Sequence, residues 1–98
     1  MHVLTDQEIT AALSGLPGWT REGDALVKRY TREGGFSGAV AFVARIAEAA
    51  DEADHHPDVT ISWNEVTLAW STHSAGGITD RDVAMARHSD AVAALGQE

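Results

Sequence analysis

Three histidines are the residues of this chain best suited to moving protons near neutral pH. His55 and His56 stand together before Pro57 in the stretch DEADHHPDVTISW, and His73 follows in the stretch STHSAGG. Histidine is the side chain whose ordinary pKa, about 6.5, allows it to donate or accept a proton near neutrality. Three such groups brought together would suit general acid–base catalysis, provided that they lie within hydrogen-bond reach of the transferred protons.

The segment before the histidine pair supplies charges that act on it in opposite directions. Asp51, Glu52 and Asp54 and the C-terminal end of the preceding helix favour imidazolium, whereas burial or a neighbouring histidinium favours the neutral ring. A mixed protonation state is therefore expected. Asp54 itself has two open roles, because it could orient an imidazole through a hydrogen bond or merely end a helix in solvent.

Composition excludes several classes of protein. The 98 residues suit one domain, 1–98, and no apolar run approaches the roughly 20 residues that a membrane helix needs. The absence of cysteine excludes disulfides, a thiolate nucleophile and cysteine-ligated metal. Fifteen acidic residues against seven basic ones give a net charge of -8, which disfavours nucleic-acid binding. Residues 1–7 lack the pattern of a secretory signal, so a cytoplasmic protein is expected.

Two capped helices are predicted at the ends of the chain. In LTDQEITAALSGLPG, Thr5 can cap the helix and Glu8 completes a capping box, with glycine and proline ending it. Near the C-terminus, Thr79 can cap a helix that has Asp82 at the capping-box position. Asp82 therefore has a structural role open to it as well as a functional one.

The longest helix is predicted in FSGAVAFVARIAEAADEAD, with Ser37 as its cap. Pro57 disfavours helical geometry at His56, so this helix should end near Asp54 or His55. Apolar residues at helical spacing predict its core face, which comprises Phe36, Val40, Val43, Ile46, Ala47 and Ala50.

Strand patterns predict two hairpins. WTREGDALVKRYT has Gly23-Asp24 as its turn, and DVTISWNEVTLAWSTH alternates apolar and polar residues around a turn at Asn64-Glu65. With that second turn, the pairs would be Trp63 with Val66, Ile61 with Leu68, Val59 with Trp70 and Asp58 with Ser71.

The same register predicts where Trp63 and two of the histidines lie. It places Trp63 among the core residues, although a pocket role is also open to it, and it brings His73 opposite His56 on the polar face. The prediction fails if the turn has a different length or if Pro57 diverts the chain.

The residues just described closely resemble the pattern of the pterin-4a-carbinolamine dehydratases. The resemblance covers nearly the whole chain and rests on DEADHHPDVTISW, STHSAGGITDRD and the spacing between them. It implies an α+β fold in which a four-stranded antiparallel sheet carries three helices on one face, in the order α-β-β-α-β-β-α. It also implies a homodimer or homotetramer.

The resemblance implies a reaction as well. Members of the family remove water from 4a-hydroxytetrahydropterin (the 4a-carbinolamine), which aromatic amino acid hydroxylases leave behind, and yield quinonoid dihydropterin in tetrahydrobiopterin recycling. No cofactor is required. Elimination needs a base for a proton on a pterin nitrogen and an acid for the departing hydroxyl, which matches a histidine cluster.

Carried onto this sequence, the family pattern makes His55 and His73 the expected proton-transfer residues, and His56 binds and orients the pterin or shares the transfer. Which histidine is the acid and which the base stays open. His2 and His88 are expected to have no catalytic role. The expected substrate-binding or supporting residues are Asp51, Asp54, Trp63, Ser71, Thr72 and Asp82.

Three other interpretations compete with this assignment. Zinc could use three imidazoles, but neighbouring histidines on extended chain point to opposite sides, so no metal is expected. A Ser-His-Asp triad with Ser71 or Ser74 is disfavoured because neither serine lies in a nucleophile-turn context. The remaining alternative is a non-catalytic protein-interaction module, since animal members of the family also serve as dimerisation cofactors of a homeodomain transcription factor.

Overall fold

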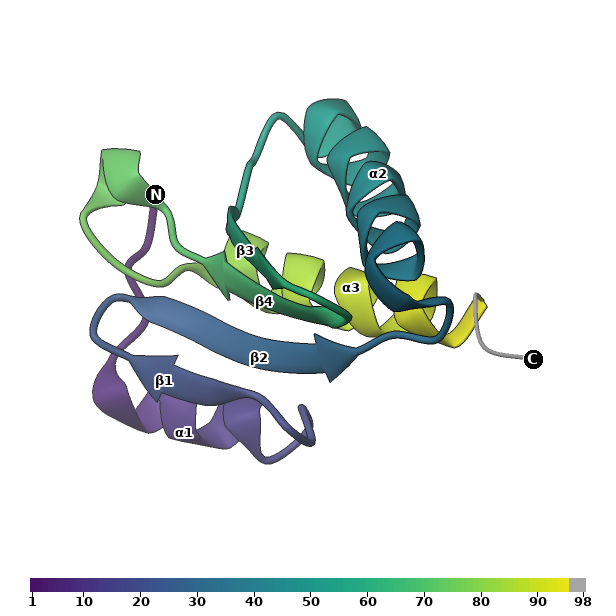
Figure 1. Cartoon of the computed structure of the whole chain (residues 1–98). Coiled ribbons are helices and arrows are strands. Elements are labelled where there is room, and N and C mark those ends of the chain that lie inside the picture. Colours follow the sequence, from purple (N-terminus) through teal and green to yellow (C-terminus); the bar gives the residue numbers. More distant parts are fainter. Residues whose placement is uncertain (96–98) are drawn as a thin grey trace.

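The computed structural model describes residues 1–95 of the 98. Three α-helices and a four-stranded antiparallel sheet follow one another in the predicted order α-β-β-α-β-β-α, with a short additional 3-10 helix, η1, before the last helix. The helices pack on one face of the sheet, as Figure 1 shows, so the predicted fold class is confirmed. The elements are α1 (Asp6–Leu13), β1 (Thr20–Glu22), β2 (Ala25–Thr31), α2 (Gly35–Ala53), β3 (Asp58–Ser62), β4 (Glu65–Trp70), η1 (His73–Ala75) and α3 (Asp80–Leu95).

The sheet has the strand order β1-β2-β4-β3, so β2 and β4 are central and β3 is an edge strand. Along β4, alternate residues Val66, Leu68 and Trp70 are fully buried against the helices. Burying a large apolar side chain stabilises the fold by about 1.5–3 kcal/mol. Within residues 1–95, no helix is long and apolar enough to cross a membrane.

Both predicted helix caps are present. The Thr5 hydroxyl oxygen accepts the Glu8 N–H at 3.1 Å, and a Glu8 carboxylate oxygen accepts the Thr5 N–H at 2.9 Å. At the start of α3, the Thr79 N–H donates to the Asp82 carboxylate at 2.9 Å, and the Arg81 N–H donates to the Thr79 hydroxyl at 3.2 Å. Short-range spacing is sufficient to find such caps, because each joins residues only two or three positions apart.

The turn of the second hairpin lies one residue earlier than predicted. Trp63 takes a positive φ of 51° and forms the two-residue turn with Asn64, while Glu65 stays in the sheet opposite Ser62. Ile61 therefore pairs with Val66 rather than Leu68. The apolar residues still share a face, because the shift moves each pairing by two positions and preserves the alternation.

The start of α2 also differs from the prediction. The helix begins at Gly35 after Gly34, whose φ of 87° is a left-handed conformation, and no side chain caps it, so the prediction of Ser37 as cap was wrong. Gly38 packs directly against the Glu33 carbonyl, where a Cβ would lie 1.8 Å from the oxygen. The glycines allow the chain to enter the helix earlier than Ser37.

The core face of α2 is rotated relative to the predicted one. Ile46 and Ala50 are buried as expected, but Ala39 and Phe42 occupy the rest of the core face. Three of the residues predicted to be in the core are exposed, namely Phe36, Val40 and Ala47. The helix is apolar on two adjacent sides, and the sheet covers only one of them.

Candidate active site

A left-handed residue at the end of α2 separates the two neighbouring histidines. Asp54 has a φ of 51°, and the His55 N–H donates back to the Ala50 carbonyl at 3.1 Å. The Arg81 guanidinium on α3 donates to the carbonyls of Ala53 and Asp54 at 2.9 Å each. After this reversal His55 is buried and His56 is exposed.

His55 is held by a buried carboxylate. Its Nε2 lies 2.5 Å from Oδ1 of Asp82, a residue that is 0% exposed. The other oxygen of Asp82 accepts the Thr72 hydroxyl at 2.8 Å and the Thr79 N–H at 2.9 Å. The Thr79 and Thr72 hydroxyl oxygens lie 2.9 Å apart. Asp82 thus joins the end of α2, the segment after β4 and the start of α3.

The contacts of His55 also determine which ring nitrogen is accessible at the surface. Because a carboxylate only accepts hydrogen bonds, Nε2 carries the proton that Asp82 accepts. Nδ1 of His55 has no hydrogen-bond partner. Within residues 1–95, every side-chain nitrogen or oxygen that is itself buried does have one. Nδ1 therefore reaches the surface. In the neutral ring this nitrogen is a proton acceptor.

Trp70 fixes the plane of the His55 ring. The two rings are stacked, with centroids 5.7 Å apart and an interplanar angle of 24°. Trp70 is itself anchored, because its indole N–H donates to the Ser89 hydroxyl at 3.1 Å. Because Asp82 binds one edge of the ring and Trp70 covers one face, His55 has little freedom to rotate.

His56 is paired in a different environment. Its Nε2 lies 2.8 Å from Oδ1 of Asp51, one turn back on α2. The side chains are 57% and 77% exposed, so water competes with this contact. Asp51 therefore contacts the exposed member of the histidine pair, His56.

His73 is exposed on η1, at the edge of a surface depression of about 270 Å³. We call this the His73 depression; it is lined by Asp24, Ala25, Asp58, Ser71, His73, Gly76 and Gly77. A backbone bridge between Thr72 and Gly77 closes the loop that carries His73. Thr72 lies between Ser71 and His73 and contacts Asp82, so the loop is connected to His55 through two side chains.

The predicted pairing of His56 with His73 is wrong. The ladder between β3 and β4 ends with Asp58 opposite Ala69, and Pro57 leads the chain away before His56 can pair. Asp58 and Ser71, expected to pair, instead share the lining of the His73 depression. The structure brings His55 together with Asp82 and Thr72, His56 with Asp51, and His73 with Ser71 and Asp58.

The structure decides between the alternatives that were open for Trp63 and Asp54. Trp63 is 70% exposed at the hairpin turn, so its placement in the core was wrong. In residues 1–95, no hydrogen bond joins the Asp54 carboxylate to an imidazole, and Asp54 serves as the C-cap residue of α2.

Sequence reasoning missed four features of the site. Thr79 and Trp70 hold Asp82 and His55 in place, and Asp24 and Gly77 line the His73 depression. Thr79 was predicted only as a helix cap, although its capping relation to Asp82 already connects it to the site. Asp24 could not have been found from the sequence, because it reaches the depression only when the first hairpin pairs with the second in the sheet.

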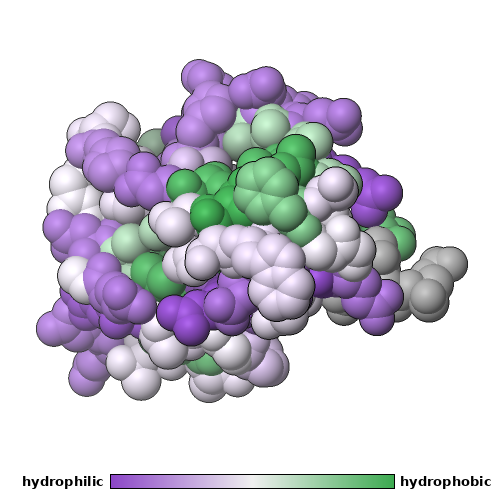
Figure 2. Space-filling view, viewed as in Figure 1, coloured by the Kyte–Doolittle hydropathy of each residue, from purple (hydrophilic) through white to green (hydrophobic). Residues whose placement is uncertain are grey.

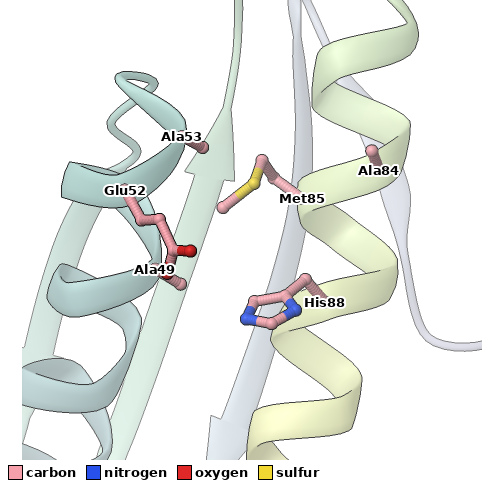
Figure 3. Close-up of a pocket in the computed structure, with 6 residues that line it drawn as sticks. All are labelled: Ala49, Glu52, Ala53, Ala84, Met85 and His88. Atoms are coloured by element: carbon pink, nitrogen blue, oxygen red, sulfur yellow. The ribbon is translucent and has the colours of Figure 1, made fainter.

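A second cavity lies away from these residues, between α2 and α3. It has a volume of about 380 Å³, and the side chains of Glu52, Met85 and His88 point toward one another between the two helices (Figure 3). Among residues 1–95, no group of three or more histidine or acidic side chains is placed to hold a metal ion.

Comparison with known proteins identifies relatives along nearly the whole chain. The family model described as Pterin 4 alpha carbinolamine dehydratase matches residues 2–92. A protein of Mycobacteroides abscessus, provisionally named pterin-4-alpha-carbinolamine dehydratase, is 56% identical over 92% of this chain and 95% of its own length. A protein of Thermomicrobium roseum with the same provisional name is 55% identical over 89% of this chain and 92% of its own.

Two solved structures share the fold. A transcriptional coactivator/pterin dehydratase from Brucella melitensis superposes with a TM-score of 0.88 at 35% identity, covering 94% of this chain and 99% of that one. A pterin dehydratase-like protein identified as a RuBisCO assembly factor in the alpha-carboxysome superposes with a TM-score of 0.61 at 22% identity, covering 76% and 86%. The second likeness concerns the fold alone.

Proposed function

Because the chain belongs to the pterin-4-alpha-carbinolamine dehydratase family, we propose that it removes water from 4a-hydroxytetrahydropterin and releases quinonoid dihydropterin, in tetrahydrobiopterin recycling. In this elimination a base takes a proton from a ring nitrogen, the electron pair forms a carbon–nitrogen double bond, and the C4a–O bond breaks. An acid protonates the departing hydroxyl, which leaves as water. The reaction needs no cofactor.

The observation that carries the proposal is the fixed orientation of the His55 ring, in which one nitrogen is hydrogen-bonded and the other reaches the surface. Asp82 accepts the proton of Nε2, while Nδ1 reaches the surface as a proton acceptor. We infer that His55 is the base. An imidazole so oriented by a buried carboxylate is a recurrent arrangement for a general base, since the carboxylate fixes the tautomer and stabilises the imidazolium that forms.

His73 is the proposed acid, and His56 the proposed binding residue. His73 is exposed on a loop that is tied to Asp82 through Thr72, so it can meet a substrate seated near His55. His56 lies beside His55 in sequence, and Asp51 restrains its ring at 2.8 Å. Ser71 and Asp58 line the His73 depression, where a hydroxyl and a carboxylate can accept the N–H groups of a pterin.

The test is the absorbance change as a synthetic 4a-hydroxytetrahydropterin dehydrates, measured above the uncatalysed background. Wild type should accelerate it, and His55→Ala and His73→Ala should each slow turnover by about 100- to 10,000-fold. His88→Ala is the matched control, because His88 lies on α3 between the helices and outside the proposed site. Circular dichroism must show that each variant is folded. Unchanged rates in both folded site variants would refute the assignment.

A second function is favoured by one specific observation. Large apolar side chains, Phe36 and Trp63, are exposed on the outside of the fold, which is typical of a protein-interaction surface. The relative from Brucella melitensis is described as a transcriptional coactivator as well as a pterin dehydratase. A non-catalytic interaction role would be supported if folded wild type failed to accelerate dehydration. We also propose a homo-oligomer, either a dimer or a tetramer, in the cytoplasm.

A further inference from the structure

The position of His73 depends on two residues at the base of its loop. We call residues 72–77 the His73 loop; it contains η1 and is closed by a backbone bridge between Thr72 and Gly77. The Thr72 N–H donates to the Gly77 carbonyl at 3.2 Å, and the Gly77 N–H donates to the Thr72 carbonyl at 3.4 Å. Both residues are buried, whereas His73 is exposed. Whatever holds Thr72 and Gly77 therefore also places the His73 imidazole.

The segment before α1 contacts the His73 loop from outside. The Leu4 N–H donates at 2.8 Å to the carbonyl of Ile78, the residue that follows the loop. Figure 1 shows this segment passing beside η1. On the other side of the loop, the Thr72 hydroxyl donates to the Asp82 carboxylate at 2.8 Å. The base of the loop is thus held from two sides, by α3 and by the chain that precedes α1.

Val3 approaches Gly77 too closely for a larger residue to stand at position 77. A Cβ added there would lie 2.7 Å from Cγ1 of Val3. Carbon atoms pack best at separations of about 3.5–4.0 Å, so such a Cβ would overlap the valine methyl group. Gly77 does not have a positive φ, unlike Gly76 at 77°. Position 77 therefore needs glycine for space, because Val3 covers it, and not for backbone freedom.

The Val3 side chain has little share in the hydrophobic core. It is 40% exposed, whereas the next residue, Leu4, is 8% exposed and belongs to the core. On its other side, the His2 ring lies 2.8 Å from the Glu8 carboxylate. The neighbours of Val3 thus fix the segment, and the Val3 side chain itself covers Gly77.

Apolar contacts are scarce around the His73 loop. On the face that Figure 2 shows, apolar side chains gather over α2 and the strands beside it, whereas the end of the molecule that carries η1 is mostly hydrophilic or neutral. The loop contains Ser74, Gly76 and Gly77, so its own side chains offer little apolar surface. Few other contacts can therefore compensate for the loss of the one between Val3 and Gly77.

We propose that Val3 is a positioning residue for His73, because its contact with Gly77 fixes the base of the loop that carries the proposed acid. The inference rests on the proposed function in taking His73 as the acid. An acid must lie within hydrogen-bond reach of the group that it protonates, and a misplacement of about 1 Å can lower a rate roughly 100-fold. Val3 does not line the His73 depression, so it acts through Gly77, which does.

The first test removes one methyl contact and then restores it. Val3→Ala deletes Cγ1, so kcat for dehydration should fall by roughly 10-fold while KM changes little, because the acid acts in the transition state. Gly77→Ala adds a methyl group that displaces Val3 or the loop, and it should lower kcat in the same way. In the double variant the methyl group at position 77 occupies the space that Cγ1 leaves, so kcat should return to within about threefold of wild type.

Val40→Ala and Gly15→Ala are the matched controls. Val40 is similarly exposed (44%) but lies on α2, and a Cβ at Gly15 would lie 3.7 Å from the Ala12 carbonyl oxygen, which is an ordinary contact. Neither control should change kcat, and circular dichroism should show that every variant is folded. A merely structural contact would lower the melting temperature and leave kcat unchanged. A folded Val3→Ala variant with the wild-type kcat, or a double variant no faster than the slower single variant, would overturn the proposal.

The second test does not depend on dehydratase activity. In NMR spectra, the resonances of the His73 ring should move in each single variant and return toward their wild-type positions in the double variant. The Leu4 N–H, which donates to Ile78, should exchange faster with solvent in both single variants. If wild type fails to accelerate dehydration while these signals respond, His73 loses its role as the acid, but Val3 still positions it. Unmoved His73 resonances in both single variants would overturn the proposal.

Discussion

Two neighbouring histidines each contact an aspartate. The two pairs have the same chemical groups but differ in burial and in the distance between those groups. In the pair His55–Asp82 the side chains are 8% and 0% exposed, whereas in the pair His56–Asp51 they are 57% and 77% exposed. The nitrogen–oxygen distances are 2.5 and 2.8 Å. The left-handed turn at Asp54 makes the difference, because it directs one ring inward and leaves the next in solvent.

The number and burial of a carboxylate's partners decide how much it contributes to the free energy of unfolding. The carboxylate of Asp82 accepts hydrogen bonds from three separate segments, and each donor would lose its partner if the carboxylate were removed. The carboxylate of Asp51 is replaceable by water. A buried pair is costly to break from one side, while an exposed pair contributes little.

The largest effect is expected from Asp82→Ala. The change leaves the His55 ring, the Thr72 hydroxyl and the Thr79 N–H without their acceptor in a buried site. The free energy of unfolding should fall by about 3–5 kcal/mol, as measured by urea titration. A loss below about 1 kcal/mol would show that water replaces the carboxylate, and the distinction between the two pairs would then fail.

A smaller loss is expected from Thr72→Val, which nearly preserves the shape and removes one hydroxyl. Thr72 is 2% exposed and donates to Asp82 while lying 2.9 Å from the Thr79 hydroxyl. The free energy of unfolding should fall by about 1–2 kcal/mol. Thr60→Val is the control, because Thr60 is exposed on the edge strand and should change stability far less. Equal effects of the two substitutions would contradict the buried network.

Breaking the exposed pair should hardly change the free energy of unfolding. Asp51→Asn removes the charge that faces His56, but water already reaches both side chains. The free energy of unfolding should change by less than about 0.5 kcal/mol in the same urea titration. A double-mutant cycle with His56→Ala isolates the pair, and a coupling above about 1 kcal/mol would mean that the pair is shielded from water.

The sequence was sufficient for the features that depend on near neighbours. The caps at Thr5 and Thr79 and the end of α2 near Asp54 follow from residues a few positions apart, so the patterns predicted them correctly. Phe36 was placed in the core wrongly, because periodicity finds that a helix side is apolar but does not show which apolar side the sheet covers.

The sequence predicted the candidate site only in part. His55 and Asp82 were both singled out, yet their contact joins positions 27 apart and depends on how α3 meets the end of α2. The predicted pairing of His56 with His73 failed for two reasons. The hairpin turn includes Trp63, in a conformation that its size disfavours, and the strand ladder ends at Asp58, after Pro57. Local rules are least able to predict such strained positions.

A third histidine–carboxylate pair provides the smallest effect and the sharpest pH test. His2 Nε2 lies 2.8 Å from the Glu8 carboxylate, and both side chains are exposed. The hydrogen bond from the Thr5 N–H, followed by the contact with His2, lowers the pKa of Glu8. A lowered pKa in the folded state stabilises the fold above the ordinary pKa of glutamate, about 4.3, and this stabilisation is lost as the pH falls through the lowered value. Glu8→Gln keeps an acceptor for Thr5 but cannot titrate, so the stability difference between wild type and variant should shrink as the pH falls from about 5 to 3 in urea titrations. A difference that stays constant over that range would assign the cap's contribution to hydrogen bonding alone, with no share from the charge of Glu8.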